Sequence, residues 1–199
     1  MARWNQPDPP YWCSLLRLKK KAFDRVNHTI LLQKLSVYLQ NSSTVSLLKS
    51  YLQDRTQVCF PEGVVKCAVP QVFVLGPLLF SIFINDPPLH IFNTKAVCDP
   101  FADDNSIHSR GTNVESVQCS LQDGLNDASK WCDQNGMVDH PGKTKSMVLA
   151  SRQKHQLKPL MLDLTLGTNI TEQVREHRVL GITIDEELKW QPHTDNICK

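Results

Sequence analysis

The sequence lacks any apolar run approaching the roughly 18 residues that a membrane-spanning helix needs. Its beginning, Met1–Trp12, also lacks the charged-then-apolar pattern of a secretion signal. Neither sign of charge is in excess, because 22 Lys and Arg stand against 20 Asp and Glu, a formal net charge of +2. These absences predict an intracellular chain (cytoplasm or nucleus) with no membrane partner, and they leave nucleic-acid binding open.

Cysteine is present without a pattern. The seven cysteines are an odd number and no Cys-x-x-Cys spacing occurs, so neither a zinc site nor a disulfide framework is indicated. Scattered thiols suit a reducing compartment, and we expect most of them to fill the core. The seven are Cys13, Cys59, Cys67, Cys98, Cys119, Cys132 and Cys198.

A chain of 199 residues is long enough for one domain with a proper core. Residues 1–14, rich in proline and polar groups at their start, are predicted to form an N-terminal tail. Basic residues gather in residues 17–25 and again in 143–158. Either cluster could bind phosphate or form an ordinary solvated surface, and the sequence does not decide between these readings.

Three helices are predicted in the first half of the chain. One begins at Asn27 or Thr29, either of which can cap it, and a second begins at a cap on Thr44. Apolar residues recur at helical spacing in both: Leu32, Leu35, Leu39, Val45, Leu48 and Leu52. A short hairpin is predicted over residues 56–69, and a third helix starts at Gly76-Pro77, with the proline in its first turn.

The second half mixes strands with one long helix. The helix is predicted from about Asn113 to Gln134, with a core-facing stripe of Val114, Val117, Leu121, Leu125, Ala128 and Trp131. A strand–turn–strand is expected around Phe101–Asp104, and further strands near 144–150, 160–166 and 178–185. Without strict βαβ repetition, this pattern favours an α+β fold, an antiparallel sheet with helices on one face.

Adjacent carboxylates at Asp103 and Asp104 are the first candidate site. Two carboxylates at a tight turn suit Mg²⁺, which prefers oxygen ligands, but an isolated Asp-Asp pair is more often a solvated loop. The surrounding motifs give the pair its meaning. They are Lys21–His28, Val69–Gln71 with Val74–Phe80 and Phe83–Asp86, Phe101–Asp104, Trp131–Cys132 with Gly142–Lys145, and Leu180–Asp185 with Leu188–Trp190.

In this order, the five motifs resemble those of the reverse transcriptase palm of non-LTR (LINE-type) retrotransposons, over about residues 15–199. The resemblance implies RNA-directed DNA polymerisation by two-metal phosphoryl transfer, with Mg²⁺, an RNA template and a DNA primer. It assigns Asp103 and Asp104 to the metals and Phe23 to the exclusion of a ribose 2′-hydroxyl. Gln71 would line the nucleotide pocket, and Lys143 would contact the triphosphate or donate a proton. The alternatives for Phe23 and Lys143 are a core aromatic and a surface lysine.

Several residues depart from the family pattern. The third metal-binding aspartate falls on Leu18, or on Arg17 if the alignment slips by one residue, and neither can bind Mg²⁺. Val72-Phe73 replaces a glycine and a small residue that let the backbone approach a nucleotide, and Ala68 replaces another glycine. Pro100 removes a backbone donor from what should be an interior strand.

The resemblance also predicts the division of the chain. Residues 15–185 would form the palm and residues 186–199 the start of a truncated thumb connection, with the fingers and most of the thumb absent. We therefore expect a catalytically dead copy that binds Mg²⁺ weakly or not at all. The alternative is a non-catalytic fold that binds nucleic acid without sequence preference, or an inert relic.

Overall fold

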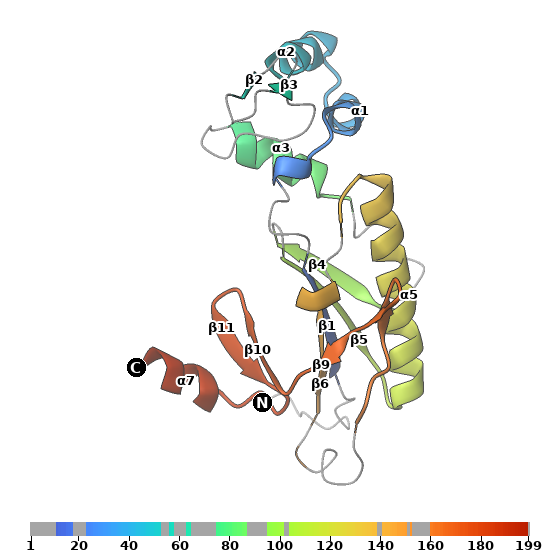
Figure 1. The fold of residues 1–199 in the computed structure, drawn as a ribbon, viewed down its shortest axis with the longest axis vertical. Coiled ribbons are helices and arrows are strands. Elements are labelled where there is room, and N and C mark those ends of the chain that lie inside the picture. Colours follow the sequence, from blue (N-terminus) through green and yellow to red (C-terminus); the bar gives the residue numbers. More distant parts are fainter. Residues whose placement is uncertain are drawn as a thin grey trace, which may run out of the picture.

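The computed structural model describes residues 11–17, 23–52, 56–57, 63–64, 75–86, 95–101, 104–138, 141–150, 152 and 160–198. These residues form two parts joined at one end of a long helix (Figure 1). We call the part built from α1, α2 and α3 the helical lobe, and the part built from the main sheet and α5 the sheet lobe. Each lobe has its own cluster of buried apolar side chains.

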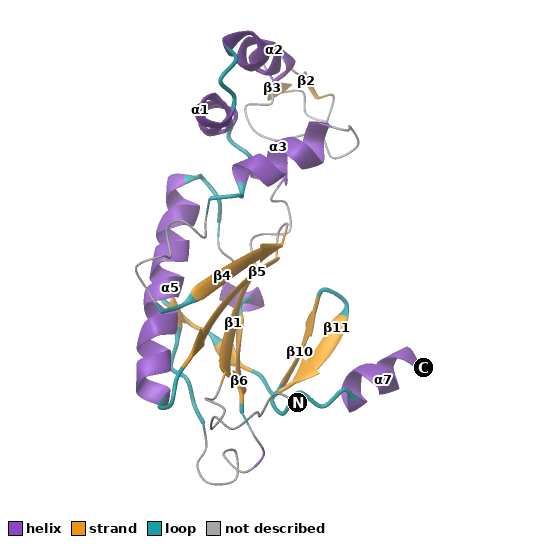
Figure 2. Ribbon diagram, turned by 180° about the vertical axis from the view of Figure 1, so that it is seen from behind, coloured by secondary structure: helices purple, strands orange, loops and turns teal. Residues whose placement is uncertain are grey.

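The sheet lobe is built on five strands. They follow the order β4 (Val97–Phe101), β5 (Asp104–Arg110), β1 (Tyr11–Arg17), β6 (Lys145–Leu149) and β9 (Glu172–Gln173). Neighbours from β4 to β6 are antiparallel, whereas β9 pairs with β6 in parallel. Figures 1 and 2 show α5 lying across one face of this sheet. The predicted α+β class is confirmed, with a parallel strand at one edge.

Strand β5 alternates between the two faces of the sheet. Asn105, Ile107 and Ser109 are buried, while the residues between them are half-exposed. Helix α5 (Val114–Gln134) contacts this strand and begins as predicted, since Asn113 accepts a hydrogen bond from the Ser116 backbone N–H at 2.8 Å. The predicted stripe on α5 is confirmed: Val117, Leu121, Leu125, Ala128 and Trp131 are all buried, and Val114 packs against them.

Helix α1 (His28–Tyr38) of the helical lobe has the predicted cap. The Asn27 side chain accepts from the backbone N–H groups of Thr29 at 2.8 Å and Ile30 at 3.3 Å. The predicted stripe is confirmed at Leu35, which is fully buried, and Leu32 and Leu39 pack partly buried against the same core. Leu31, which was not predicted, is the other fully buried position of the helix. With two adjacent leucines, residue type alone does not set which of them faces the core.

Helix α2 (Ser42–Leu52) begins earlier than predicted. The Ser43 backbone N–H donates to the Asn41 side chain at 2.9 Å, so Asn41 is the cap and Thr44 lies within the first turn. The predicted cap on Thr44 was therefore wrong, because an asparagine three positions upstream already satisfies a terminal N–H group.

Helix α3 (Leu75–Phe83) has Pro77 in its first turn, as predicted, and buries Leu79, Phe80 and Phe83. The predicted hairpin before it is present where the structure describes it, as β2 (Thr56–Gln57) paired antiparallel with β3 (Gly63–Val64). The buried end of α5 joins this lobe's core through Trp131 and Cys132.

The C-terminal third departs most from the predicted strands. A strand was expected over residues 160–166, but only Thr165–Leu166 (β7) is a strand, and it pairs with Asn169–Ile170 (β8). The single strand predicted over 178–185 is a hairpin of β10 (Glu176–Val179) and β11 (Ile182–Asp185). Helix α7 (Gln191–Ile197) then packs on β11.

A tight turn explains the last error. Leu180 and Gly181 join β10 to β11 with φ values of 48° and 88°. Two successive positive φ angles are typical of a type I′ turn, which Asn-Gly usually occupies. Because leucine occupies the first position here, the sequence did not indicate the turn.

Two further predictions need correction. Residues 11–14, assigned to the tail, form the first part of β1 in the middle of the main sheet. Pro100 was placed in an interior strand, but β4 lies at an edge of the sheet. Phe101 and Asp104 pair across the turn, so the alternation of an antiparallel ladder directs the Pro100 nitrogen away from β5, where no donor is needed. Among the helices that the structure describes, there is no candidate for a membrane-spanning segment.

Candidate active site

The candidate site is centred on the start of β5. Phe101 of β4 pairs with Asp104 of β5, which confirms a strand on each side of the predicted turn. On the other side of β5, the Cα of Arg17, the last residue of β1, pairs with that of Asp104. Asp104 of the third motif therefore lies next to the end of the strand that precedes the first motif. Asp103 and Leu18 lie outside the described residues.

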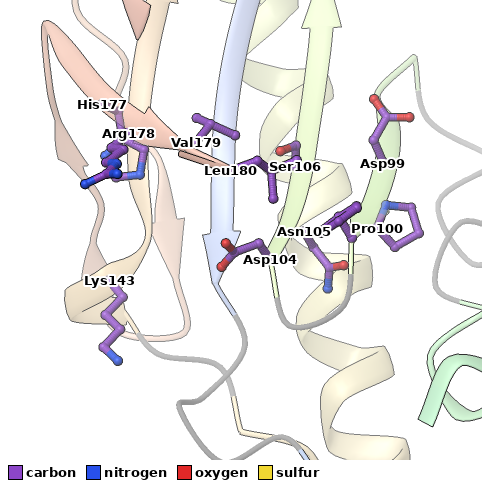
Figure 3. Close-up of a pocket in the computed structure, with 11 residues that line it drawn as sticks. Asp99, Pro100, Asp104, Asn105, Ser106, Lys143, His177, Arg178, Val179 and Leu180 are labelled. Atoms are coloured by element: carbon purple, nitrogen blue, oxygen red, sulfur yellow. The ribbon is translucent and has the colours of Figure 1, made fainter. Parts of the chain in front are cut away.

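A pocket of about 230 Å³ opens beside Asp104 (Figure 3). The hairpin β4–β5 forms one wall, and β10 with the turn residue Leu180 forms the other. Its lining residues are Asp99, Pro100, Phe101, Asp104, Asn105, Ser106, Lys143, His177, Arg178, Val179 and Leu180. The Asp104 carboxylate points toward the side that carries Lys143 and Arg178, so anionic and cationic groups face the same space.

Lys143 ends a short 3₁₀ turn, Pro141–Lys143, that leads into β6. Because β6 pairs with β1, and β1 with β5, this turn comes close to the start of β5. The structure thus brings together two of the predicted site residues, Asp104 and Lys143, in one pocket.

Phe23 lies away from this pocket, in the 3₁₀ turn Phe23–Arg25. Its ring stacks on Phe80 of α3, with centroids 3.9 Å apart and planes 20° apart. Half-buried against the helical lobe, Phe23 has the contacts of a core aromatic as well as a partly open face. Gln71, Val72, Phe73 and Ala68 lie outside the described residues.

The pocket does not contain a complete metal site among the residues that the structure describes. No three His, Cys, Asp or Glu side chains of these residues gather as possible ligands. The second carboxylate of the pocket, Asp99, faces His108, with Oδ2 to Nδ1 at 3.2 Å. Mg²⁺ is held by several oxygen ligands in near-octahedral geometry, and of the expected ligand positions that carry a carboxylate only Asp104 lies within the described residues.

Sequence reasoning missed the contribution of β10. His177 and Arg178 line the pocket opposite Asp104, and Arg178 is exposed. The fifth motif includes the turn of this hairpin, but its predicted single strand gave no reason to place His177 and Arg178 near Asp104. The turn at Leu180–Gly181 is the one sequence signal from which the β10–β11 hairpin could have been predicted.

Comparison with known proteins identifies the family of the chain. Residues 9–184 match the family model described as reverse transcriptase (RNA-dependent DNA polymerase). The chain therefore belongs to the reverse transcriptase family.

Similar curated proteins include polymerases of transposable elements from Drosophila melanogaster. The chain is 31% identical over 186 residues to a probable RNA-directed DNA polymerase from transposon BS, covering 87% of this chain and 20% of that protein. It is 26% identical over 189 residues to the RNA-directed DNA polymerase from mobile element jockey, covering 89% and 20%. A probable RNA-directed DNA polymerase from transposon X-element is 26% identical over 200 residues, covering 96% and 21%.

These relatives confirm the resemblance to reverse transcriptases of non-LTR retrotransposons. The chain spans about a fifth of the length of the curated relatives it matches. What a full-length relative does therefore transfers to this chain only as a proposal.

Proposed function

We propose that this chain is a catalytically silent copy of a non-LTR reverse transcriptase domain, with residues 15–185 as its palm. Its ancestral reaction would be RNA-directed DNA polymerisation on an RNA template with a DNA primer. The observation that supports this most is the register that pairs Arg17 with Asp104. Arg17, one of the two residues onto which the third metal-binding aspartate of the family falls, is thus the neighbour of Asp104 across the two strands.

Loss of a carboxylate at this position is the main reason to expect no polymerase activity. Two-metal polymerisation needs carboxylates from separate strands around the ions, which stabilise the charge that develops on the attacking and leaving oxygens. A leucine supplies no ligand, and an arginine would repel the cation. Without the carboxylate, we expect Mg²⁺ to bind weakly or not at all and the rate to fall by about a thousandfold or more.

Primer extension on an RNA template tests the proposal. The parent chain should extend a labelled primer no faster than a protein-free control, with Mg²⁺ or with Mn²⁺. Leu18→Asp and Val72→Gly, alone and combined, restore the family residues and should raise extension if these changes silenced an otherwise intact site. Arg17→Asp tests the alternative alignment.

Asp104→Asn in the repaired background is the matched control, because it should abolish any activity that the repairs restore. Robust extension by the parent chain, lost in Asp104→Asn, would contradict the proposed silence. Extension by the parent that persists in Asp104→Asn would point to a contaminating polymerase.

A second candidate function is non-specific binding of nucleic acid. Lys143 and Arg178 line the same pocket, and lysine and arginine neutralise phosphates without reading the bases. Affinity should be roughly micromolar or weaker and should fall steeply with salt.

Fluorescence anisotropy with a labelled RNA or DNA at several salt concentrations tests this candidate. Lys143→Ala and Arg178→Ala should each lower the slope of log affinity against log salt by about 1. Arg175→Ala is the control, since Arg175 is exposed but lies outside the pocket. If no nucleic acid binds at low salt, this candidate function is wrong and the remaining interpretation is an inert relic.

A further inference from the structure

The two lobes share one element, helix α5. Its residues Val117 to Ala128 pack in the core of the sheet lobe, whereas Trp131 and Cys132 pack in the core of the helical lobe. Figures 1 and 2 show the helical lobe meeting the rest of the molecule at this end of α5. The orientation of one lobe on the other therefore depends on what holds α3 and α1 to the last turns of α5.

A polar contact occurs at this junction. Oδ1 of Asp86, just after α3, accepts hydrogen bonds from Lys34 Nζ of α1 at 2.8 Å and from Trp131 Nε1 of α5 at 3.2 Å. Lys34 Nζ also donates to the Phe83 backbone carbonyl at 2.7 Å, at the end of α3. One carboxylate oxygen thus connects three segments that are far apart in the sequence.

Aromatic rings enclose the ammonium group of Lys34. It lies 4.6 Å from the centroid of the Phe83 ring and 5.1 Å from that of Trp131, within the range of cation–π attraction. Only 14% of the Lys34 side chain and 22% of the Asp86 side chain are exposed, so both charges are largely removed from water. Burial lowers the pKa of Lys34, while the Asp86 carboxylate opposes that shift.

The degree of burial separates this contact from the other ion pairs of the described residues. In each of those, at least one partner is more than half exposed. Exposed pairs contribute little to stability, whereas a buried charge that loses its partner is strongly unfavourable. Geometry at the junction is therefore tightly constrained, since the contact is favourable only while all three side chains keep their places.

We propose that Lys34, Asp86 and Trp131 form a joint that sets the orientation of the helical lobe on the sheet lobe. The three act as positioning residues. Apolar packing of Trp131 supplies much of the attraction between the lobes, and the directional hydrogen bonds to Asp86 select one orientation among those that packing alone would allow.

Helix α3 transmits this orientation to Phe23. Its C-terminal end is fixed by the joint, and its Phe80 ring stacks on Phe23. A shift of α3 would therefore move Phe23 relative to the Asp104 pocket. The consequence for nucleotide contact at Phe23 rests on the function proposed above, whereas the joint itself does not depend on that function.

A distance measurement between the lobes tests the proposal in the full chain. Spin labels are attached through an unnatural amino acid at Leu47 of α2 and at Glu115 of α5, both exposed, so that the native cysteines stay in place. Double electron–electron resonance then gives the distribution of distances between the labels. In Asp86→Ala we expect this distribution to broaden or shift, while circular dichroism still reports folded helices.

Asp127→Ala is the matched control, because it removes an ion pair that lies within α5, between Asp127 and Lys130. It should leave the distribution unchanged. An unchanged, narrow distribution in folded Asp86→Ala would overturn the proposal, since packing alone would then fix the lobes.

Trp131→Phe keeps the proposal testable if Asp86→Ala does not fold. Phenylalanine retains an aromatic ring but removes the N–H that donates to Asp86. We expect a smaller broadening than in Asp86→Ala, and Lys34→Met should add to it. A residue with only a general stabilising role would lower the unfolding temperature and leave the distances in the folded protein as they were. That result for Trp131→Phe and Lys34→Met would also overturn the joint.

Discussion

Phe23 and Phe80 form a stacked pair, with ring centroids 3.9 Å apart and an angle of 20° between the planes. Phe80 is 2% exposed, whereas Phe23 is only half-buried. One ring is thus part of the core, and the other covers it at the surface of the helical lobe.

Replacing the two rings should therefore have unequal effects. Phe80→Ala should lower the free energy of unfolding by about 3–5 kcal/mol, because it leaves a cavity in a packed core. Phe23→Ala should cost clearly less, since its ring is already partly in water. Urea unfolding followed by circular dichroism measures both. Leu78→Ala, on the exposed face of the same helix, should change stability by no more than about 0.5 kcal/mol.

The side chain of Gln122 on α5 hydrogen-bonds to both backbone groups of Thr165, as a neighbouring strand would. The Thr165 N–H donates to Gln122 Oε1 at 2.8 Å, and Gln122 Nε2 donates to the Thr165 carbonyl at 2.8 Å. Gln122→Ala removes both bonds and should destabilise the protein by about 1 kcal/mol. Hydrogen exchange of the Thr165 amide should accelerate. Asn126→Ala, which leaves the backbone bonds in place, should not accelerate it.

Replacing Leu180 should stabilise the turn of the β10–β11 hairpin. Leu180 has a positive φ and is 53% exposed, so Leu180→Asn relieves backbone strain and loses little buried surface. We expect a local gain of about 1 kcal/mol, read from slower hydrogen exchange in β10 and β11.

Gly181→Ala should have the opposite effect on the same exchange. No atom lies within 4 Å of a Cβ added at Gly181, so any loss would come from its φ of 88° rather than from a clash. Faster exchange in Leu180→Asn would contradict the assignment of a strained turn.

Two cysteines should differ sharply in reactivity. Burial, reinforced by the nearby Asp99 carboxylate, raises the pKa of Cys98 to about 12, whereas Cys119 on α5 is exposed. Because the thiolate is the reactive form, iodoacetamide near pH 8 should label Cys119 and spare Cys98. Peptide mapping by mass spectrometry measures both sites. Urea-unfolded protein is the control in which Cys98 should react, and labelling of Cys98 in the folded protein would contradict its burial.

Local patterns predicted the elements with clear signals. The stripe on α5 and its cap at Asn113 follow from the 3.6-residue period and from a side chain that accepts hydrogen bonds. The adjacent Leu31 and Leu32 in α1 left it ambiguous which of them is buried. The turn at Leu180 was not predicted, because asparagine or glycine is the usual residue at such a position. Both errors concern single residues whose placement depends on tertiary contacts.

The candidate site was predictable only in part, because it combines distant segments. Motif resemblance indicated Asp104 and Lys143, and the structure places both at one pocket. Arg178 was not predicted, since its place follows from how the β10–β11 hairpin lies beside the main sheet, and no spacing in the sequence encodes that. The role of each of these residues in chemistry stays a prediction.

Pro100 has a consequence for how copies of this chain behave at high concentration. Among the described strands, β4 has a neighbour on one side only, and its residues Val97 and Phe101 expose apolar side chains. Such an edge invites a strand from another molecule to add to the sheet, which is the first step of aggregation. Proline leaves a gap in the row of outward N–H donors that an incoming strand would need. Pro100 at this edge strand thus protects the sheet against self-association.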